Sequence, residues 1–250
     1  MDLKGKTALI TGAARVGGAV AEALAERGCR VALSYRSSRN AAEKTARAIR
    51  RRGGETLLLR ADLARDTEAR RLVAAVLRQW GRLDVLINMA SLYERTSLAD
   101  LRRPGAATRA LRRSLSVDLE SAHRLAHLAA PAMEKNGAGR IINFTDWVAA
   151  SGRPRYKGFG LYYIAKAAVK GLTETLALEL APRVLVNAIA PGPILAPAGL
   201  SRAAHREVID ATPLRRWGGP AEVAKAVLFL VETDFVTGET LRVDGGRHLS

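Results

Sequence analysis

The sequence predicts an α/β fold in which about seven parallel strands form one doubly wound sheet, with helices on both faces. Short apolar runs of strand type alternate along the chain with longer segments that carry apolar residues at helical spacing. Turns rich in Gly, Pro, Asp and Asn follow several strands, at the ends where ligands bind in sheets of this kind. The 250 residues suffice for one large core, so we expect residues 1–250 to form a single domain.

The composition indicates a globular protein without a membrane segment. Hydrophobic residues make up 48% of the sequence, and no apolar run reaches the roughly 18 residues of a membrane-spanning helix. The first residues lead directly into a predicted strand and leave no room for a signal peptide. The single cysteine, Cys29, excludes an internal disulfide and fits a reducing compartment. We therefore expect a cytoplasmic protein.

The net charge of +16 raises the question of nucleic-acid binding. The arginines are scattered over several predicted helices, and only 5% of the residues are aromatic, too few for stacking platforms. We therefore expect no nucleic-acid partner, and the sequence predicts no metal site either. Attraction of anionic small molecules, such as a phosphorylated cofactor, explains the positive charge better.

The first unit of the chain has the pattern of a dinucleotide-binding loop. Lys6–Thr11 is an apolar run typical of a buried strand, and a tight turn then leads into an Ala-rich helix that ends at Gly28. Glycines let the backbone approach a pyrophosphate, and the helix N-terminus offers N–H groups and a positive dipole end. A Rossmann-type cofactor site is therefore predicted in this turn, at Gly12, Arg15, Val16, Gly17 and Gly18.

The end of the second strand, Arg30–Tyr35, predicts the form of the cofactor. An acid at this position accepts hydrogen bonds from the ribose of NAD, but no acid follows here until Glu43. Arg36 and Ser37 instead suit a 2′-phosphate, because a guanidinium forms charge-assisted hydrogen bonds with phosphate. The pattern favours NADPH/NADP+. The alternative is that these arginines belong to the general surplus of positive charge.

The alternation of strands and helices continues to the end of the chain. The helix at 67–80, for example, carries Leu72, Val73 and Val76 on one face. The further strands expected are residues 55–61, 83–87, 140–144, 184–189 and 240–243. The helices expected are residues 19–27, 40–52, 67–80, 109–135 (continuous or interrupted), 162–180 and 220–232.

Further turns are expected to meet the Gly-rich turn at the carboxyl edge of the sheet, because each follows a predicted strand. They are Asp62-Leu63, Asn88 to Tyr93, Asp146, and Pro191-Gly192. Residues 193–213 contain several Pro, Gly and small residues around a short helical piece. This composition predicts a flap over the site.

Tyr162 and Lys166 lie four residues apart on the predicted helix 162–180, so they share one helix face. A nearby ammonium stabilises phenolate and lowers the pKa of a tyrosine, which makes it a better proton donor or acceptor near neutral pH. Taken alone, the pair is better explained as an ordinary surface Tyr and Lys on an amphipathic helix.

Taken together, these motifs resemble the short-chain dehydrogenases/reductases along nearly the whole chain. The residues that carry the resemblance, in the family's order and spacing, are Thr11-Gly12, Gly18, Asp62, Asn88-Met89-Ala90, Tyr162, Lys166, Pro191-Gly192, Thr237-Gly238 and Val243 to Gly246. The resemblance implies that Tyr162 donates the proton and that Lys166 lowers its pKa and binds the nicotinamide ribose. The other cofactor contacts that it implies are Asp62, Leu63, Asn88, Ala90, Pro191 and Gly192. It also implies a homotetramer.

Within this family the chain looks most like the pteridine reductases. The stretch with Ser91 and Tyr93 resembles theirs, in which an aromatic ring packs against the pterin. Asp146 stands where most of the family carries a catalytic serine and where pteridine reductases carry an aspartate. The resemblance implies that Asp146 helps Tyr162 to protonate a ring nitrogen, which suits reduction of a C=N bond. The alternative is that Asp146 caps the turn after its strand.

Three features depart from the pteridine reductase pattern. Val16 replaces a basic residue that contacts cofactor and substrate, and Asp118 replaces the asparagine with which many relatives hold a water near the active lysine. The segment from Asp146 to Tyr162 is about three residues longer than usual for the family. Its inserted residues, 153–158, are basic and are predicted to reach an acidic substrate tail such as a folate glutamate.

These observations predict an NADPH-dependent reductase of a pterin or folate-type C=N bond. The substrate contacts expected are Ser91, Tyr93, Asp146 and Tyr162. The alternative within the family is reduction of a 3-oxoacyl group on an acyl carrier protein, although a ketone oxygen favours a neutral hydroxyl donor over a carboxylate. An alternative from another class is a cofactor-binding regulator without catalysis, which the retained Tyr162 and Lys166 disfavour.

Overall fold

Seven strands pair into one parallel sheet in the computed structural model, which describes residues 1–152 and 154–250. They are β1 (Thr7–Thr11), β2 (Arg30–Tyr35), β3 (Thr56–Arg60), β4 (Val85–Asn88), β5 (Gly139–Phe144), β6 (Val184–Pro191) and β7 (Thr240–Val243). Their order in the sheet is β3-β2-β1-β4-β5-β6-β7. The order reverses between β1 and β4, so the switch point at which such sheets bind ligands lies there.

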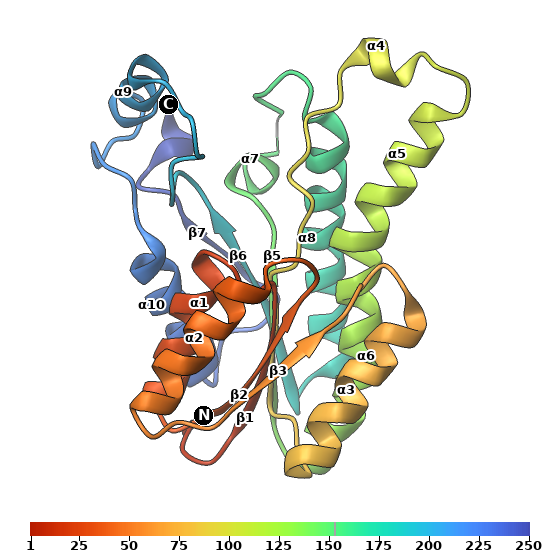
Figure 1. The fold of residues 1–250 in the computed structure, drawn as a ribbon, viewed down its shortest axis with the longest axis vertical. Coiled ribbons are helices and arrows are strands. Elements are labelled where there is room, and N and C mark those ends of the chain that lie inside the picture. Colours follow the sequence, from red (N-terminus) through yellow and green to blue (C-terminus); the bar gives the residue numbers. More distant parts are fainter. Residues whose placement is uncertain (153) are drawn as a thin grey trace.

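The helices cover both faces of the sheet, as predicted. They are α1 (Val16–Glu26), α2 (Arg39–Arg51), α3 (Asp66–Trp80), α4 (Leu98–Leu101), α5 (Ala106–Leu115), α6 (Ser121–Lys135), α7 (Trp147–Ala150), α8 (Gly160–Leu180), α9 (Arg202–Asp210) and α10 (Pro220–Glu232). Helices α1, α2 and α10 lie on one face, and α3, α6 and α8 lie on the other (Figure 1).

The sheet divides the core into two apolar layers, because a parallel sheet is buried on both faces. Neighbouring residues of β1 point into different layers. Ile10 packs in the layer that contains Leu24 of α1 and Val227 of α10. Leu9 packs in the layer that contains Leu125 of α6, and all of these side chains are fully buried.

The region predicted as helix 109–135 is interrupted. A π-helical turn, η1 (Ser116–Glu120), separates α5 from α6. The sequence did not predict α4 or α7, which have four residues each, nor the 3-10 turn η2 (Arg247–Leu249). Elements of about one turn are too short to show an apolar periodicity.

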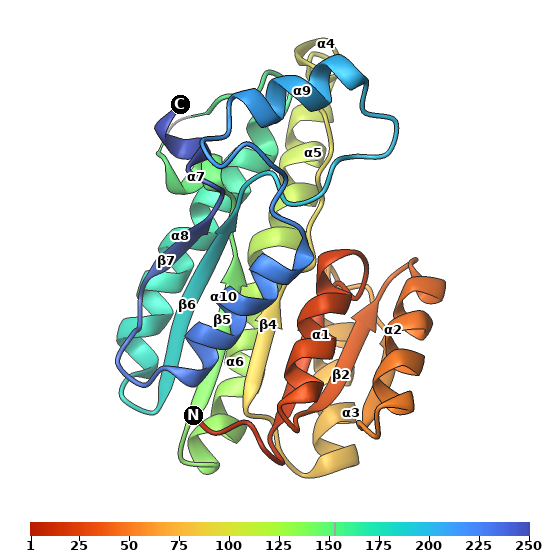
Figure 2. The ribbon, with the colours of Figure 1, turned by 90° about the vertical axis from the view of Figure 1, so that its left-hand side faces the viewer.

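The short helical piece expected within residues 193–213 is α9, which lies beyond the carboxyl ends of the strands (Figure 2). The segment connects β6 to α10. Its movement as a flap stays a prediction. No helix among the described residues is long and apolar enough to cross a membrane.

Gly12 and Gly17 are required by the close packing of the turn between β1 and α1. Gly12 has a φ of 82°, in the left-handed region that favours glycine. A Cβ added to Gly17 would lie 2.2 Å from the carbonyl oxygen of Gly12, and a backbone atom cannot rotate away as a side chain can. The path of the Gly-rich turn therefore excludes any side chain at Gly17.

Gly17→Ala is expected to lower the free energy of unfolding by roughly 1–3 kcal/mol, because the added methyl group overpacks a backbone contact. The matched control is Gly171→Ala on α8, where an added Cβ meets nothing within 4 Å. That variant should gain about 0.5–1 kcal/mol, because alanine is the better helix former. Urea denaturation measures both changes, and equal stabilities of the two variants would contradict the packing argument.

Candidate active site

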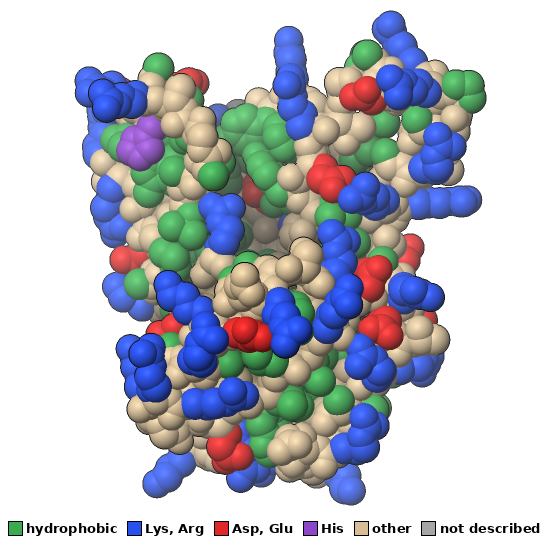
Figure 3. All heavy atoms as spheres, in the orientation of Figure 1, with side chains coloured by type: hydrophobic (Ala, Val, Ile, Leu, Met, Phe, Trp, Pro, Cys, Tyr) green, Lys and Arg blue, Asp and Glu red, His purple; other side chains and the backbone are tan. Residues whose placement is uncertain are grey.

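A cavity of about 820 Å³ lies at the carboxyl edge of the sheet, next to the switch point between β1 and β4. Its walls come from the turns after β1 to β6, the first turn of α8 and part of residues 193–213. Figure 3 shows the hollow on this face of the molecule, with hydrophobic side chains in it and Lys and Arg side chains around it. The cavity has the size and the mainly apolar walls of a cofactor and substrate site.

Most of the predicted site residues line this cavity. They are Gly12, Arg15, Val16, Arg36, Ser37, Asp62, Leu63, Ala90, Ser91, Tyr93, Asp146, Tyr162, Pro191 and Gly192. Four predicted residues do not line it: Gly17, Gly18, Asn88 and Lys166. Gly18 packs against Thr45 of α2, and the amide of Asn88 donates to Asn143 Oδ1 (2.9 Å). A contact between these four residues and a cofactor stays a prediction.

The turn between β1 and α1 has the donors that a pyrophosphate needs. Arg15 occupies the N-cap position of α1, and because its guanidinium can only donate hydrogen bonds, it leaves the N–H groups of the first turn uncapped. Its guanidinium instead donates to the main-chain oxygens of Leu195 (3.4 Å) and Ala196 (3.5 Å). The first turn of α1 thus keeps its positive dipole end for an anionic group in the cavity.

Arg36 and Ser37 line the cavity after β2. Arg36 forms no hydrogen bond or ion pair with another described residue, whereas Arg39 is bound to Glu43 (2.7 Å) and is not part of the wall. The alternative, that these arginines merely belong to the general excess of positive charge, therefore explains Arg39 better than Arg36. With the α1 turn, this donor set fits a phosphorylated dinucleotide.

Asp146 and Tyr162 form a hydrogen-bonded pair in the wall. Tyr162 lies in the first turn of α8, and its hydroxyl donates to Asp146 Oδ2 (3.1 Å). Asp146 follows β5, and its Oδ1 accepts from the main-chain N–H of Val148 (2.8 Å), which caps α7. The capping interpretation is confirmed, and it is compatible with a catalytic role, because Oδ1 caps α7 while Oδ2 accepts the hydrogen bond of the Tyr162 hydroxyl.

Burial raises the pKa of Asp146 above its ordinary value, against the opposing effects of the Val148 N–H, the Tyr162 hydroxyl and the charge of Lys166. A carboxyl group with a raised pKa keeps its proton to higher pH. Asp146 therefore has the chemistry of a proton carrier next to Tyr162.

The pKa of Tyr162 is raised overall in this structure, and a lowering contribution from Lys166 stays a prediction. Burial, and then the charges of Asp146 and Asp118, hold the pKa of Tyr162 well above its ordinary value. The Nζ atom of Lys166 lies 5.8 Å from the centre of the Tyr162 ring but 3.0 Å from Asp118 Oδ1. The lysine charge is thus shared with a carboxylate, and Tyr162 is a protonated group.

Two hydrogen bonds fix this part of α8 to the end of β5. The Thr145 hydroxyl donates to the main-chain oxygen of Lys166 (2.7 Å), and Lys166 Nζ donates to the main-chain oxygen of Phe144 (2.7 Å). Both Thr145 and Lys166 are buried. The helix that carries Tyr162 is therefore held against the strand that delivers Asp146.

Aromatic rings form the wall next to Tyr162. Tyr93, in the turn after β4, stacks on Phe159 with 4.6 Å between ring centres, and meets the Tyr162 ring edge-on at 5.0 Å. Trp147 and Tyr156 form a second edge-on pair with 6.3 Å between ring centres. Of these residues, the sequence analysis assigned only Tyr93 and Tyr162 to the site. Trp147 directly follows Asp146, which was a usable signal.

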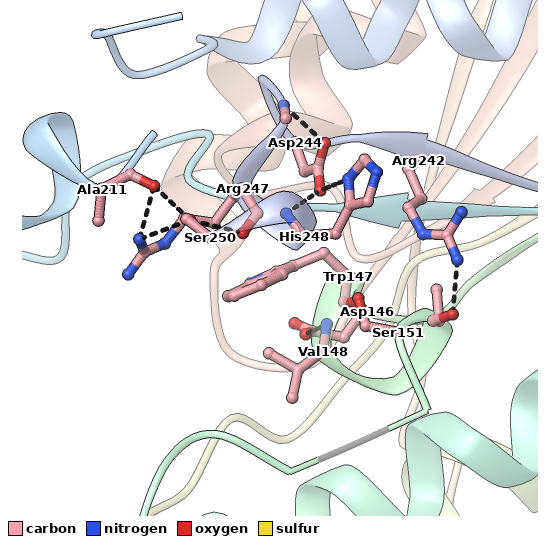
Figure 4. A network of polar contacts seen from close by, with 12 residues as sticks. Asp146, Trp147, Val148, Ser151, Ala211, Arg242, Asp244, Arg247, His248 and Ser250 are labelled. Atoms are coloured by element: carbon pink, nitrogen blue, oxygen red, sulfur yellow. Dashed lines mark hydrogen bonds and ion pairs between the residues drawn. The ribbon is translucent and has the colours of Figure 1, made fainter. Parts of the chain in front are cut away.

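The last residues of the chain form part of the wall, which the sequence did not predict. The Arg247 guanidinium lies 5.6 Å from the centre of the Trp147 ring and donates to the main-chain oxygen of Ala211 (2.6 Å) (Figure 4). Nδ1 of His248 lies 2.7 Å from Asp244 Oδ2, which holds this turn together. The motif Val243 to Gly246 directly precedes Arg247, but it did not assign Arg247 to the site, because only the tertiary structure brings Arg247 to Trp147.

The longer segment between Asp146 and Tyr162 contributes Arg155 to the cavity wall. Its guanidinium lies 5.2 Å from the centre of the Trp147 ring. Arg153, which was predicted to act with it on an acidic substrate tail, lies outside the described residues. The contact of this segment with a substrate tail stays a prediction.

Comparisons with known proteins agree with this architecture. A family profile described as "Enoyl-(Acyl carrier protein) reductase" matches residues 12–248. The 3-oxoacyl-[acyl-carrier-protein] reductase FabG of Staphylococcus epidermidis is 33% identical, over 98% of this chain and 99% of its own. The chain belongs to the short-chain dehydrogenase/reductase family.

Two solved structures of similar proteins contain nicotinamide cofactors. A 7α-hydroxysteroid dehydrogenase complexed with NADH and 7-oxo glycochenodeoxycholic acid has a TM-score of 0.88 and 32% identity, covering 98% of this chain and 94% of its own. FolM alternative dihydrofolate reductase 1 from Brucella canis, complexed with NADP, has a TM-score of 0.89 and 31% identity, covering 100% and 96%. The predicted fold is thereby confirmed, and the chain is an NAD(P)-dependent reductase of this family.

Asp146→Asn is expected to raise the free energy of unfolding at neutral pH and to leave it unchanged below about pH 4. The pKa of Asp146 is higher in the folded state than in the unfolded chain. Between these two pKa values the folded protein therefore binds more protons than the unfolded chain. Wild-type stability therefore falls as pH rises through that window, and the amide variant escapes this loss. Urea denaturation at several pH values measures the difference.

The control is Asp100→Asn, because its hydrogen bond with Ser97 lowers the pKa of Asp100. This variant should lose stability at neutral pH, the opposite sign. A gain for Asp146→Asn that is the same at every pH would contradict the electrostatic explanation.

Proposed function

We propose that this protein is an NADPH-dependent reductase of a C=N bond in a pterin or dihydrofolate-type substrate. The hydrogen bond between Tyr162 and Asp146 Oδ2 (3.1 Å), in a cavity with aromatic walls, carries the proposal. Tyr162 serves as the proton donor, assisted by Asp146 and Lys166. The similarity to FolM, whose name gives it a dihydrofolate reductase activity, supports the same substrate class.

Reduction of a C=N bond adds a hydride to carbon and a proton to nitrogen. NADPH supplies the hydride when it is bound. Because its pKa is raised, Tyr162 is protonated, and its hydroxyl therefore carries the proton that the nitrogen takes up. Asp146, whose pKa burial also raises, then takes up a proton from solvent and passes it to the Tyr162 oxygen along their hydrogen bond.

The walls next to Tyr162 support a flat heterocyclic substrate. Tyr93 and Phe159 are stacked with 4.6 Å between ring centres, and Tyr93 also lines the cavity beside the phenol. Aromatic side chains favour offset stacking or edge-to-face contact with another ring. A pterin ring beside Tyr93 would therefore present its C=N bond to the Tyr162 hydroxyl.

The proposal includes a preference for NADPH over NADH. Arg36 and Ser37 line the cavity after β2, and no acid stands there to accept hydrogen bonds from a ribose. Arg36 is the cation expected to pair with the 2′-phosphate. The other proposed cofactor contacts are Gly12, Arg15, Val16, Asp62, Leu63, Ala90, Pro191 and Gly192, with Gly17, Gly18, Asn88 and Lys166 behind them.

Reduction of a 3-oxoacyl group on an acyl carrier protein is the second candidate. The identity of 33% with FabG favours it. The site argues against it, because a carboxylate 3.1 Å from the phenol oxygen would lie close to the negative charge that develops on a ketone oxygen. A neutral hydroxyl in place of Asp146 would suit that reaction better.

We also propose that the protein is a homotetramer. The family resemblance implies assembly through long central helices, for which α6 and α8 would be the candidates here. Large apolar side chains are exposed on α8, on α10 and after it, at Leu178, Phe229 and Phe235. Contact between subunits would remove such side chains from water.

Purified protein is expected to oxidise NADPH with dihydropterin or dihydrofolate and not with short β-ketoacyl substrates. Tyr162→Phe should lower kcat by about 10²–10⁴-fold, because the proton donor is lost. Its affinity for NADP+ should stay nearly unchanged. Asp146→Ser is the matched variant and should lose the pterin activity while gaining activity on ketoacyl substrates. Oxidation of NADPH with ketoacyl substrates alone would eliminate the pterin proposal.

Arg36→Ala is expected to raise the Kd for NADP+ by about 10–100-fold, because a charge-assisted hydrogen bond to the 2′-phosphate is lost. The Kd for NAD+, which has no such phosphate, should change little. Arg39→Ala is the control, since Arg39 is bound to Glu43 outside the cavity wall. Isothermal titration calorimetry measures these constants, and an equal loss for both cofactors would place Arg36 away from the 2′-phosphate.

A further inference from the structure

Asp118 and Lys166 form a buried ion pair behind the cavity wall. Asp118 lies in the π-helical turn η1, and its Oδ1 is 3.0 Å from Lys166 Nζ on α8. The two side chains are 0% and 3% exposed, respectively. Lys166 Nζ also donates to the main-chain oxygen of Phe144 (2.7 Å), so the ammonium is fixed from two sides.

Asp118 also holds the turn after β4, which carries Tyr93. The Ser91 hydroxyl donates to Asp118 Oδ1, and the main-chain N–H of Leu92 donates to Oδ2 (3.2 Å). Both carboxylate oxygens therefore have donors, and η1, α8 and this turn meet at one side chain. An asparagine would offer a single acceptor oxygen, without the charge.

The ion pair determines how strongly the positive charge of Lys166 acts on Tyr162. The titratable groups that face Tyr162 are Asp146 after β5, Asp118 in η1, Lys166 on its own helix and Tyr93 after β4. An unpaired ammonium beside a phenol favours phenolate. An ammonium 3.0 Å from a carboxylate has its effect on a neighbouring phenol largely cancelled. Burial and the charge of Asp146 then keep the phenol neutral.

We propose that Asp118 is a positioning residue that holds Lys166 in place and cancels its charge, so that Tyr162 works as a neutral proton donor and not as a phenolate base. The inference rests on the proposed role of Tyr162 as the donor. It concerns the protonation state in which this oxygen begins each reaction: reduction takes a proton from it, whereas the reverse oxidation uses the same oxygen as a base.

The test is an alkaline titration of the protein without cofactor or substrate, followed by the ultraviolet difference absorbance of tyrosinate. Subtracting the curve of Tyr162→Phe isolates the signal of Tyr162. In Asp118→Asn, Tyr162 should ionise roughly one to three pH units lower than in the wild type, because Lys166 then acts without a carboxylate. Glu120→Gln removes a charge from the exposed side of η1 and should leave the titration unchanged.

A second variant keeps the test decisive if a buried Lys166 without a partner prevents folding. The double variant Asp118→Asn with Lys166→Met removes both charges of the pair. If the pair acts as a nearly neutral unit, Tyr162 should titrate in this variant as in the wild type. A displaced midpoint in the double variant, or an unchanged one in folded Asp118→Asn, would overturn the proposal.

The pH profile of reduction gives an independent readout. The alkaline limb of kcat/KM should move to lower pH in Asp118→Asn and stay in place in Glu120→Gln. An equal loss of rate at all pH values would mean that Asp118 only supports the fold, and would overturn the charge role. The titration needs no substrate, so its result stands or fails separately from the proposed pterin activity.

Discussion

Because the seven strands are parallel, they all end at one edge of the sheet, and the turns that follow them meet there. Arg36, Tyr93 and Asp146 follow β2, β4 and β5, and all three line one cavity although they are far apart in the sequence. An antiparallel arrangement would send alternate turns to the opposite edge. The parallel pairing of the strands is therefore what brings the side chains of the site together.

The protonation of the Tyr162 phenol is controlled by the charged groups that the fold buries around it. Asp146 accepts its hydrogen bond, and Asp118 binds the ammonium of Lys166. Removing charged groups from water is costly, and each of these groups is compensated by an ion pair or hydrogen bond. The outcome is a phenol that keeps its proton, with a carboxyl group of raised pKa beside it. This arrangement suits proton donation.

The family shares this scaffold among different substrates, so the wall around the phenol must supply the specificity. Here that wall consists of stacked aromatic rings and of two arginines, Arg155 and Arg247, that lie over Trp147. Its parts come from the turn after β4, the longer segment before α8 and the end of the chain. The wall beside the phenol is thus built by contacts between segments that lie far apart in the sequence.

The sequence by itself determined the strand and helix order, the Gly-rich turn and the pairing of Tyr162 with Lys166 on one helix face. These features depend on local periodicity and on spacing, which a sequence displays directly. It also placed Asp146 at a strand end, where its Oδ2 accepts a hydrogen bond from the Tyr162 hydroxyl.

Only the tertiary structure decided the state of Tyr162, because burial and the charges of Asp146 and Asp118 act on it through space. Asp118 pairs there with Lys166, 48 positions away in the chain. It likewise brought Arg247 to Trp147, since a contact between distant segments leaves no periodic signal in either of them.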